Sequence, residues 1–160
     1  MKRMILFAAV VSLFCLPMVA STKLSPADEA AAFKAAGFKL QGKQWRVCDD
    51  SSPSYTPGKI EQANDLNGDG RLDALITEGS TNCYGSAEVG YSLVAQQANG
   101  SWKLMAQGSG MISFLTTKGV GGWPDFEVGG PGFCFPVLRW NGKQYVLHGH
   151  QYEGKPCRGN

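Results

Sequence analysis

The sequence has little net charge, and this shortage excludes two classes of partner. The 160 residues carry 15 Lys and Arg against 13 Asp and Glu. Two of the positive charges, Lys2 and Arg3, lie at the amino terminus, so the rest of the chain is almost neutral. Binding to nucleic acid or to an anionic membrane surface requires a basic excess. We therefore expect neither as the main partner of this protein.

Long hydrophobic runs are also lacking. The one extended apolar segment, Met4 to Leu16, falls short of the roughly 18 residues that a membrane-spanning helix needs. It follows two basic residues and precedes small residues that end near Ser21, the pattern of a cleaved secretory signal. We predict a signal peptide over residues 1–21 and a single exported domain over residues 22–160. The domain would be periplasmic or secreted, with no membrane insertion after cleavage.

Cysteine is scarce, and its spacing excludes a zinc site of the usual kind because no CxxC pair is present. Four cysteines remain after the signal peptide: Cys48, Cys83, Cys134 and Cys157. An even number in an exported chain predicts two disulfides, with three possible pairings. Because Cys83 and Cys134 occupy matching positions in two similar stretches described below, we expect them to pair with each other. Cys48 would then pair with Cys157.

Candidate catalytic groups are few. The chain has two histidines, His148 and His150, in the sequence HGH. Either could act as an acid or base with a nearby carboxylate, or bind a transition metal. Ser109 lacks the flanking residues of a hydrolase nucleophile, and no phosphate-binding loop or cofactor fingerprint occurs. We assign no catalytic and no cofactor-binding residue, so whether the chain is an enzyme stays open.

What the sequence has in abundance is glycine, with 21 residues, and glycine divides most of the chain into short segments. Before Gly37, the segment Pro26 to Ala36 predicts one helix, with Ser25 as its amino-terminal cap. After Gly37 the pattern predicts strands, whereas residues 49–58 read as a loop. The predicted strands are Gln44–Val47, Ala74–Thr77, Tyr91–Gln96, Trp102–Ala106, Val137–Trp140 and Tyr145–His148. We expect a mainly β, compact antiparallel domain with one short N-terminal helix.

Two stretches of the chain resemble each other and suggest blade-like hairpin units. Each has an aspartate before an apolar strand, then a glycine, a cysteine, a further strand and an Asn-Gly turn, at Asn99-Gly100 and at Asn141-Gly142. Asp73 and Asp125 are 52 positions apart, and Cys83 and Cys134 are 51 apart. A period of this size is typical of β repeats, although two copies are too few to close a propeller. Duplication and coincidence both remain open.

The most specific chemical signal is the segment DLNGDGRLD, from Asp65 to Asp73. Side-chain oxygens recur at alternate positions, on Asp65, Asn67, Asp69 and Asp73, and the carbonyl of Arg71 falls in the same series. Calcium binds six to eight oxygens, and a chain that curls around the ion supplies them in this alternating way. An EF-hand would need Glu at the twelfth position, where Ile76 stands. The alternative is an Asn/Asp/Gly turn without a metal.

The pattern D-x-N-x-D-G-x-x-D before an apolar strand resembles the calcium loops of FG-GAP and VCBS repeats. The resemblance covers about Gly58 to Gly79. It implies that Ca²⁺ is bound between two strands, through the residues Asp65, Asn67, Asp69, Arg71 (carbonyl) and Asp73. A fainter match at Trp123 to Gly130 keeps Asp125 but has none of the preceding acids, so we do not expect it to bind an ion.

These observations predict an exported, calcium-stabilised β-domain that acts as a binding or structural module, with a protein or a surface glycan as its partner. The aromatic segment Trp123–Pro136 could form part of such a binding surface, or it could fill the core around a disulfide. The alternative functions are a small secreted hydrolase that uses His148 or His150 with a carboxylate, and an exported enzyme inhibitor.

Overall fold

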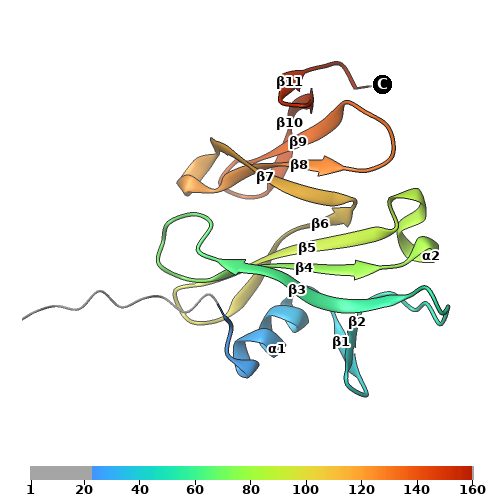
Figure 1. Ribbon diagram of the computed structural model, residues 1–160. Coiled ribbons are helices and arrows are strands. Elements are labelled where there is room, and N and C mark those ends of the chain that lie inside the picture. Colours follow the sequence, from blue (N-terminus) through green and yellow to red (C-terminus); the bar gives the residue numbers. More distant parts are fainter. Residues whose placement is uncertain (1–22, 160) are drawn as a thin grey trace, which may run out of the picture.

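The computed structural model describes residues 23–159, which form two antiparallel sheets and a helix arranged in three layers (Figure 1). The predicted signal peptide lies outside the described residues. Within residues 23–159, no helix has the length and hydrophobicity needed to cross a membrane. The mainly β, antiparallel fold with an N-terminal helix is confirmed.

Helix α1 (Pro26–Ala35) forms as its local sequence predicts. Ser25 is the cap, and its Oγ accepts a hydrogen bond from the Asp28 amide at 3.1 Å. Pro26 occupies the first turn, where its missing N–H costs nothing. The chain leaves the helix through Gly37, whose φ of +87° lies in the left-handed region that favours glycine. The predicted helix is correct to within one residue.

The first sheet has six strands in sequence order. They are β1 (Lys39–Gln41), β2 (Gln44–Arg46), β3 (Thr56–Asn64), β4 (Asp73–Gly79), β5 (Val89–Gln96) and β6 (Trp102–Ser109). A short helix, α2 (Thr81–Tyr84), and a 3-10 turn, η1 (Gly85–Ala87), connect β4 to β5. β3 begins at Thr56, inside the segment that the sequence predicted to be a loop, so that boundary was wrong.

The second sheet has five strands, in the order β11-β10-β9-β8-β7. They are β7 (Met111–Lys118), β8 (Pro124–Gly129), β9 (Phe135–Trp140), β10 (Tyr145–Tyr152) and β11 (Lys155–Pro156), with a 3-10 turn η2 (Val120–Gly122) before β8. Both Asn-Gly turns connect neighbouring strands, β5 to β6 and β9 to β10. The two similar stretches of sequence therefore occupy equivalent places in two four-strand meanders, β3–β6 and β7–β10.

The six-stranded sheet is covered on both faces, and β4 in its middle is apolar on both. On one face, Ala74 and Ile76 pack with Phe33 of α1 in a first core. On the other face, Leu75 packs against the second sheet in a second core, together with Phe126. Alternate residues of a strand face opposite sides, so one short strand contributes to both cores. This explains why its sequence is a nearly continuous apolar run.

The disulfides join Cys48 to Cys83 and Cys134 to Cys157, so the expected pairing of Cys83 with Cys134 was wrong. The expectation used the matching positions of these two cysteines in the similar stretches. Matching positions, however, lie in different sheets. Each cysteine instead finds a partner within its own sheet: Cys48 follows β2 and Cys83 lies in α2, whereas Cys134 precedes β9 and Cys157 follows β11.

Candidate functional site

The predicted calcium loop connects β3 to β4, and its backbone wraps around the carboxylate of Asp65. Oδ1 of Asp65 accepts hydrogen bonds from the amides of Gly68 at 2.8 Å and Asp69 at 3.1 Å, and Oδ2 accepts one from Gly70 at 2.8 Å. Gly68 and Gly70 have φ values of +85° and +83°, which only glycine adopts without strain. The sequence places both glycines where the loop reverses direction.

The middle of the loop is held by Asp69. Its Oδ1 accepts a hydrogen bond from the Arg71 amide at 2.9 Å, and its Oδ2 accepts one from Asn67 Nδ2 at 3.0 Å. The Arg71 guanidinium pairs with the same carboxylate and also donates to the carbonyl of Gln96 at 3.0 Å. Ion pairs at the surface contribute little free energy. The pairing of Arg71 with Asp69 is therefore a weak constraint on the loop.

Asp73 differs from the other acids because it is buried, with 1% of its surface exposed. It is the first residue of β4 and lies on the same side as Leu75, toward the second sheet. The structure gives its carboxylate one hydrogen bond, from the Leu66 amide to Oδ2 at 3.0 Å. Burial raises the pKa of Asp73 to about 7, and the negative charges of Asp69 and Asp65 add to the rise. A buried carboxylate without a cationic partner is unusual.

These side chains suit calcium in their chemistry, because they offer three carboxylates and one amide oxygen within a single loop. In the arrangement described, no group of three or more His, Cys, Asp and Glu residues within 23–159 lies close enough together to hold a metal ion. Asp69 is paired with Arg71 in this arrangement. Binding an ion among the three acids therefore requires these carboxylates to move closer together than they lie in this arrangement.

The equivalent aspartate of the second sheet, Asp125, already has a cation. Arg139 donates from Nε at 3.0 Å and from a terminal nitrogen at 2.7 Å, and Thr117 donates its hydroxyl at 2.6 Å. The hydrogen bond from Arg139 lowers the pKa of Asp125. Asp125 is therefore buried as an ion pair, whereas the charged groups that act on the buried Asp73 are Asp69, Asp65 and Arg71 of the same loop.

The two histidines lie on β10, and one of them is near a buried carboxylate. His148 is exposed and His150 is half-buried. The charge of His148 is close enough to Asp125 to contribute, behind Arg139, to the lowered pKa of that aspartate. Both oxygens of Asp125 are nevertheless occupied by Arg139 and Thr117. Over residues 23–159 neither histidine makes a hydrogen bond to an acid.

The aromatic segment Trp123–Pro136 divides between the core and the surface. Trp123 and Phe126 are buried between the sheets, with exposed fractions of 7% and 0%. Phe133 is 78% exposed and lies edge-on to Tyr152, with ring centres 6.2 Å apart. The core interpretation therefore holds for Trp123 and Phe126, whereas Phe133 lies at the surface.

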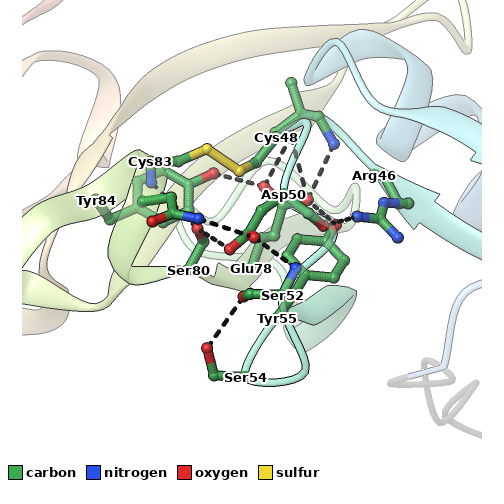
Figure 2. Close-up of a disulfide and its surroundings, with 12 residues drawn as sticks. Arg46, Cys48, Asp50, Ser52, Ser54, Tyr55, Glu78, Ser80, Cys83 and Tyr84 are labelled. Atoms are coloured by element: carbon green, nitrogen blue, oxygen red, sulfur yellow. Dashed lines mark hydrogen bonds between the residues drawn. A yellow bond between two sulfur atoms is a disulfide. The ribbon is translucent and has the colours of Figure 1, made fainter.

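A buried polar cluster beside the Cys48–Cys83 disulfide was not predicted from the sequence (Figure 2). Glu78 lies at its centre and is 2% exposed. It accepts hydrogen bonds from the Val47 amide at 3.0 Å, from the Tyr84 hydroxyl at 2.6 Å and from the Tyr55 hydroxyl. Burial, and then the contact with Glu78, raise the pKa of both tyrosines.

Asp50 forms the second half of this cluster and is also 2% exposed. It accepts hydrogen bonds from the Ser80 hydroxyl at 2.7 Å, the Ser52 amide at 2.8 Å and Asn82 at 3.0 Å. These partners are scattered through two loops, so no spacing in the sequence indicates them. Through these hydrogen bonds Glu78 and Asp50 join the segment after β2 to the end of β4 and to α2.

Comparisons with known proteins do not assign the chain to a family. No protein-family model matches the chain, and neither the curated proteins nor the solved structures give a significant match. Arguments about function therefore rest on the residues and contacts described above.

Proposed function

We propose that the protein is an exported β-domain that calcium stabilises at the loop Asp65–Asp73, and that it acts as a binding module for a partner protein. Calcium in this role fixes a loop rather than carrying a signal, as in extracellular modules that bind the ion with dissociation constants on the order of 10⁻⁴ to 10⁻³ M.

The observation that carries the calcium proposal is the position of Asp73. Its carboxylate is almost fully buried, has one hydrogen bond, and faces a loop that holds two further acids, Asp65 and Asp69. Removing a charged group from water without a partner is costly. A divalent cation in the loop would give Asp73 a close positive partner, and it would also balance the charges of Asp65 and Asp69.

The second sheet supports this interpretation by contrast. Where the preceding acids are absent, the equivalent Asp125 is neutralised by Arg139. In the second sheet, the buried Asp125 thus has a positive charge beside it. In the first sheet, the equivalent Asp73 follows a loop whose acids suit a cation. We infer that Arg139 and calcium serve the same purpose in the two sheets.

The loop lies where an ion would stabilise the whole domain. Leu66 packs into the core between the two sheets, and Leu72 packs into the core beneath α1. The carbonyl oxygen of Asn67 also lies against Gly122 of the second sheet, 2.5 Å from where a Cβ at Gly122 would stand. Fixing the loop would therefore fix the junction of the sheets.

Thermal unfolding with and without calcium tests the proposal. With a dissociation constant in the expected range, 10 mM calcium raises the melting temperature by about 4–10 °C. Asp69→Ala abolishes this rise, because it removes a ligand at the surface without opening the core. Asp49→Ala, a matched change of an exposed aspartate outside the loop, retains it. Absence of a calcium-dependent rise in the wild-type protein, or its persistence in Asp69→Ala, would overturn the proposal.

A further inference from the structure

Strand β3 has an open edge along its second half. On one side it pairs with β4 as far as Asn64. On the other side β2 pairs with it at a single position, Trp45 opposite Gly58. From Lys59 to Asn64, no strand within residues 23–159 occupies that outer side. Unpaired backbone N–H and C=O groups at a sheet edge can pair with a further strand.

A groove of about 520 Å³ adjoins this edge on the side of α1. Its lining is mixed: Phe33 of α1, Trp45 of β2, and Ile60 and Ala63 of β3 are apolar, and charged residues such as Lys43, Lys59 and Glu61 lie among them. Trp45 stacks on Phe33 with the ring planes 9° apart and the ring centres 4.9 Å apart. The groove is therefore backed by two rings that already support each other.

A second groove, of about 440 Å³, adjoins the same edge on the side of the second sheet. Its apolar lining comes from Leu75 of β4, Val89 of β5, and Met111 and Ile112 of β7. Met111 is 68% exposed. Methionine is a flexible, polarisable side chain that adapts to varied apolar partners, and it is suited to the rim of a binding groove.

The two grooves share Lys59 and Glu61 of β3, so they lie on opposite faces of one strand edge. Side chains of an added strand would point alternately to these two faces. We propose that the open edge of β3 binds an extended peptide segment of a partner protein by strand addition, with alternate apolar side chains entering the two grooves. This inference rests on the proposed role as a binding module and names the kind of partner.

Two features of the edge limit what it accepts. Lys59 and Glu61 form an exposed ion pair at 2.7 Å, and the pairing of β3 with β4 is shifted at two places. Charges and irregular pairing at an edge prevent indiscriminate association of strands. The free edge spans six residues, Lys59 to Asn64, which corresponds to about 20 Å of extended chain. The ligand is therefore a short segment rather than a whole sheet.

Selection from a displayed library of random octapeptides tests the proposal on the full mature chain in 5 mM calcium. The expected binders carry apolar residues at alternate positions. Methylating their backbone nitrogens one at a time should abolish binding at every second position, because those N–H groups face β3. Amide exchange should show new protection within Lys59 to Asn64 when a selected peptide binds.

Two matched variants locate the site on the protein. Met111→Arg places a charge at the rim of one groove without disturbing the core. It should lower the affinity for a selected peptide by about tenfold or more. Leu147→Arg makes the same change at another exposed apolar side chain, on β10, and should leave the affinity unchanged. Equal effects of the two variants, or a footprint outside β3, would overturn the proposal.

Other outcomes are equally decisive. Failure to select any binder overturns the proposal. So does a concentration-dependent dimer of the wild-type chain that Met111→Arg dissociates, because the occupant is then a second copy. Peptide binding that survives in a chain without a calcium-induced thermal shift would overturn the calcium site alone. A calcium shift without peptide binding would overturn the edge site alone.

Discussion

At the scale of single residues, Glu78 is a buried carboxylate whose oxygens depend on hydrogen-bond donors around it. It accepts hydrogen bonds from amide and hydroxyl donors, and one of these donors, Tyr55, lies against the guanidinium of Arg46. Replacing it by glutamine would turn an NH₂ group toward donors that need an acceptor. We expect Glu78→Gln to lower the free energy of unfolding by about 1–3 kcal/mol, measured by urea denaturation. Glu88→Gln, at an exposed position, serves as the control, and equal stability of the two variants would contradict this account.

Because of Asp50, the free energy of unfolding should depend on pH. The Ser80 hydroxyl and then the Ser52 amide lower its pKa to about 2. Because the pKa is lower in the folded than in the unfolded state, where it is about 3.9, the ionised form favours folding. Its stabilisation is complete above pH 4 and is lost as the pH falls toward 2. We expect the difference in unfolding free energy between the wild-type protein and Asp50→Asn to shrink over this interval. A constant difference would rule this linkage out.

At the scale of elements, the two disulfides should differ in their contribution. The cysteines are 35 residues apart in Cys48–Cys83 and 23 apart in Cys134–Cys157, so chain entropy predicts nearly equal effects of about 3–4 kcal/mol. Cys48–Cys83, however, also holds together the loop after β2 and helix α2, which share the buried hydrogen bonds of Glu78 and Asp50.

Replacing each pair by alanine tests this difference. The Cys48→Ala, Cys83→Ala double variant should lose more stability than the Cys134→Ala, Cys157→Ala variant, by more than the few tenths of a kcal/mol that loop length explains. Chemical denaturation of both variants measures the losses. Equal losses would show that the polar cluster holds without its disulfide.

The elements that the sequence predicted correctly are those with strong local signals. Capping by Ser25 and the two Asn-Gly turns depend on neighbouring residues alone. β3 was missing from the predicted strands because it carries Pro57, Gly58 and charged residues, and two register shifts interrupt its alternation. β7, with the sequence MISFLTTK, was missed because its apolar residues do not alternate regularly with polar ones and none of its residues is fully buried.

At the scale of the whole molecule, the packing of the two sheets determines features that could not be predicted from the sequence. The acids of Asp65–Asp73 are visible in the sequence, but the burial of Asp73 depends on a second sheet whose strands begin about 40 residues later. The disulfide pairs likewise depend on which sheet each loop belongs to. Periodicity and spacing describe local structure, whereas these features arise from contacts between distant segments.

The junction of the two sheets offers a prediction about the whole domain. Gly122 has a φ of +79°, and a Cβ there would lie 2.5 Å from the carbonyl oxygen of Asn67 in the loop Asp65–Asp73. The neighbouring Gly121 has a φ of +66°, and a Cβ there would meet only a Trp123 ring atom, at 3.9 Å. Alanine at either position is strained in its backbone. At Gly122 alone it also pushes the loop and the second sheet apart.

We therefore expect Gly122→Ala to lose about 1–3 kcal/mol more stability than Gly121→Ala. Because the displaced Asn67 belongs to the loop, Gly122→Ala should also reduce the calcium-induced rise in melting temperature, which Gly121→Ala should retain. Fluorescence of the buried Trp123 and Trp140, which lie between the sheets, reports the loosened junction. If both variants unfold alike and respond alike to calcium, the loop does not hold the sheets together, and any bound ion stabilises the first sheet alone.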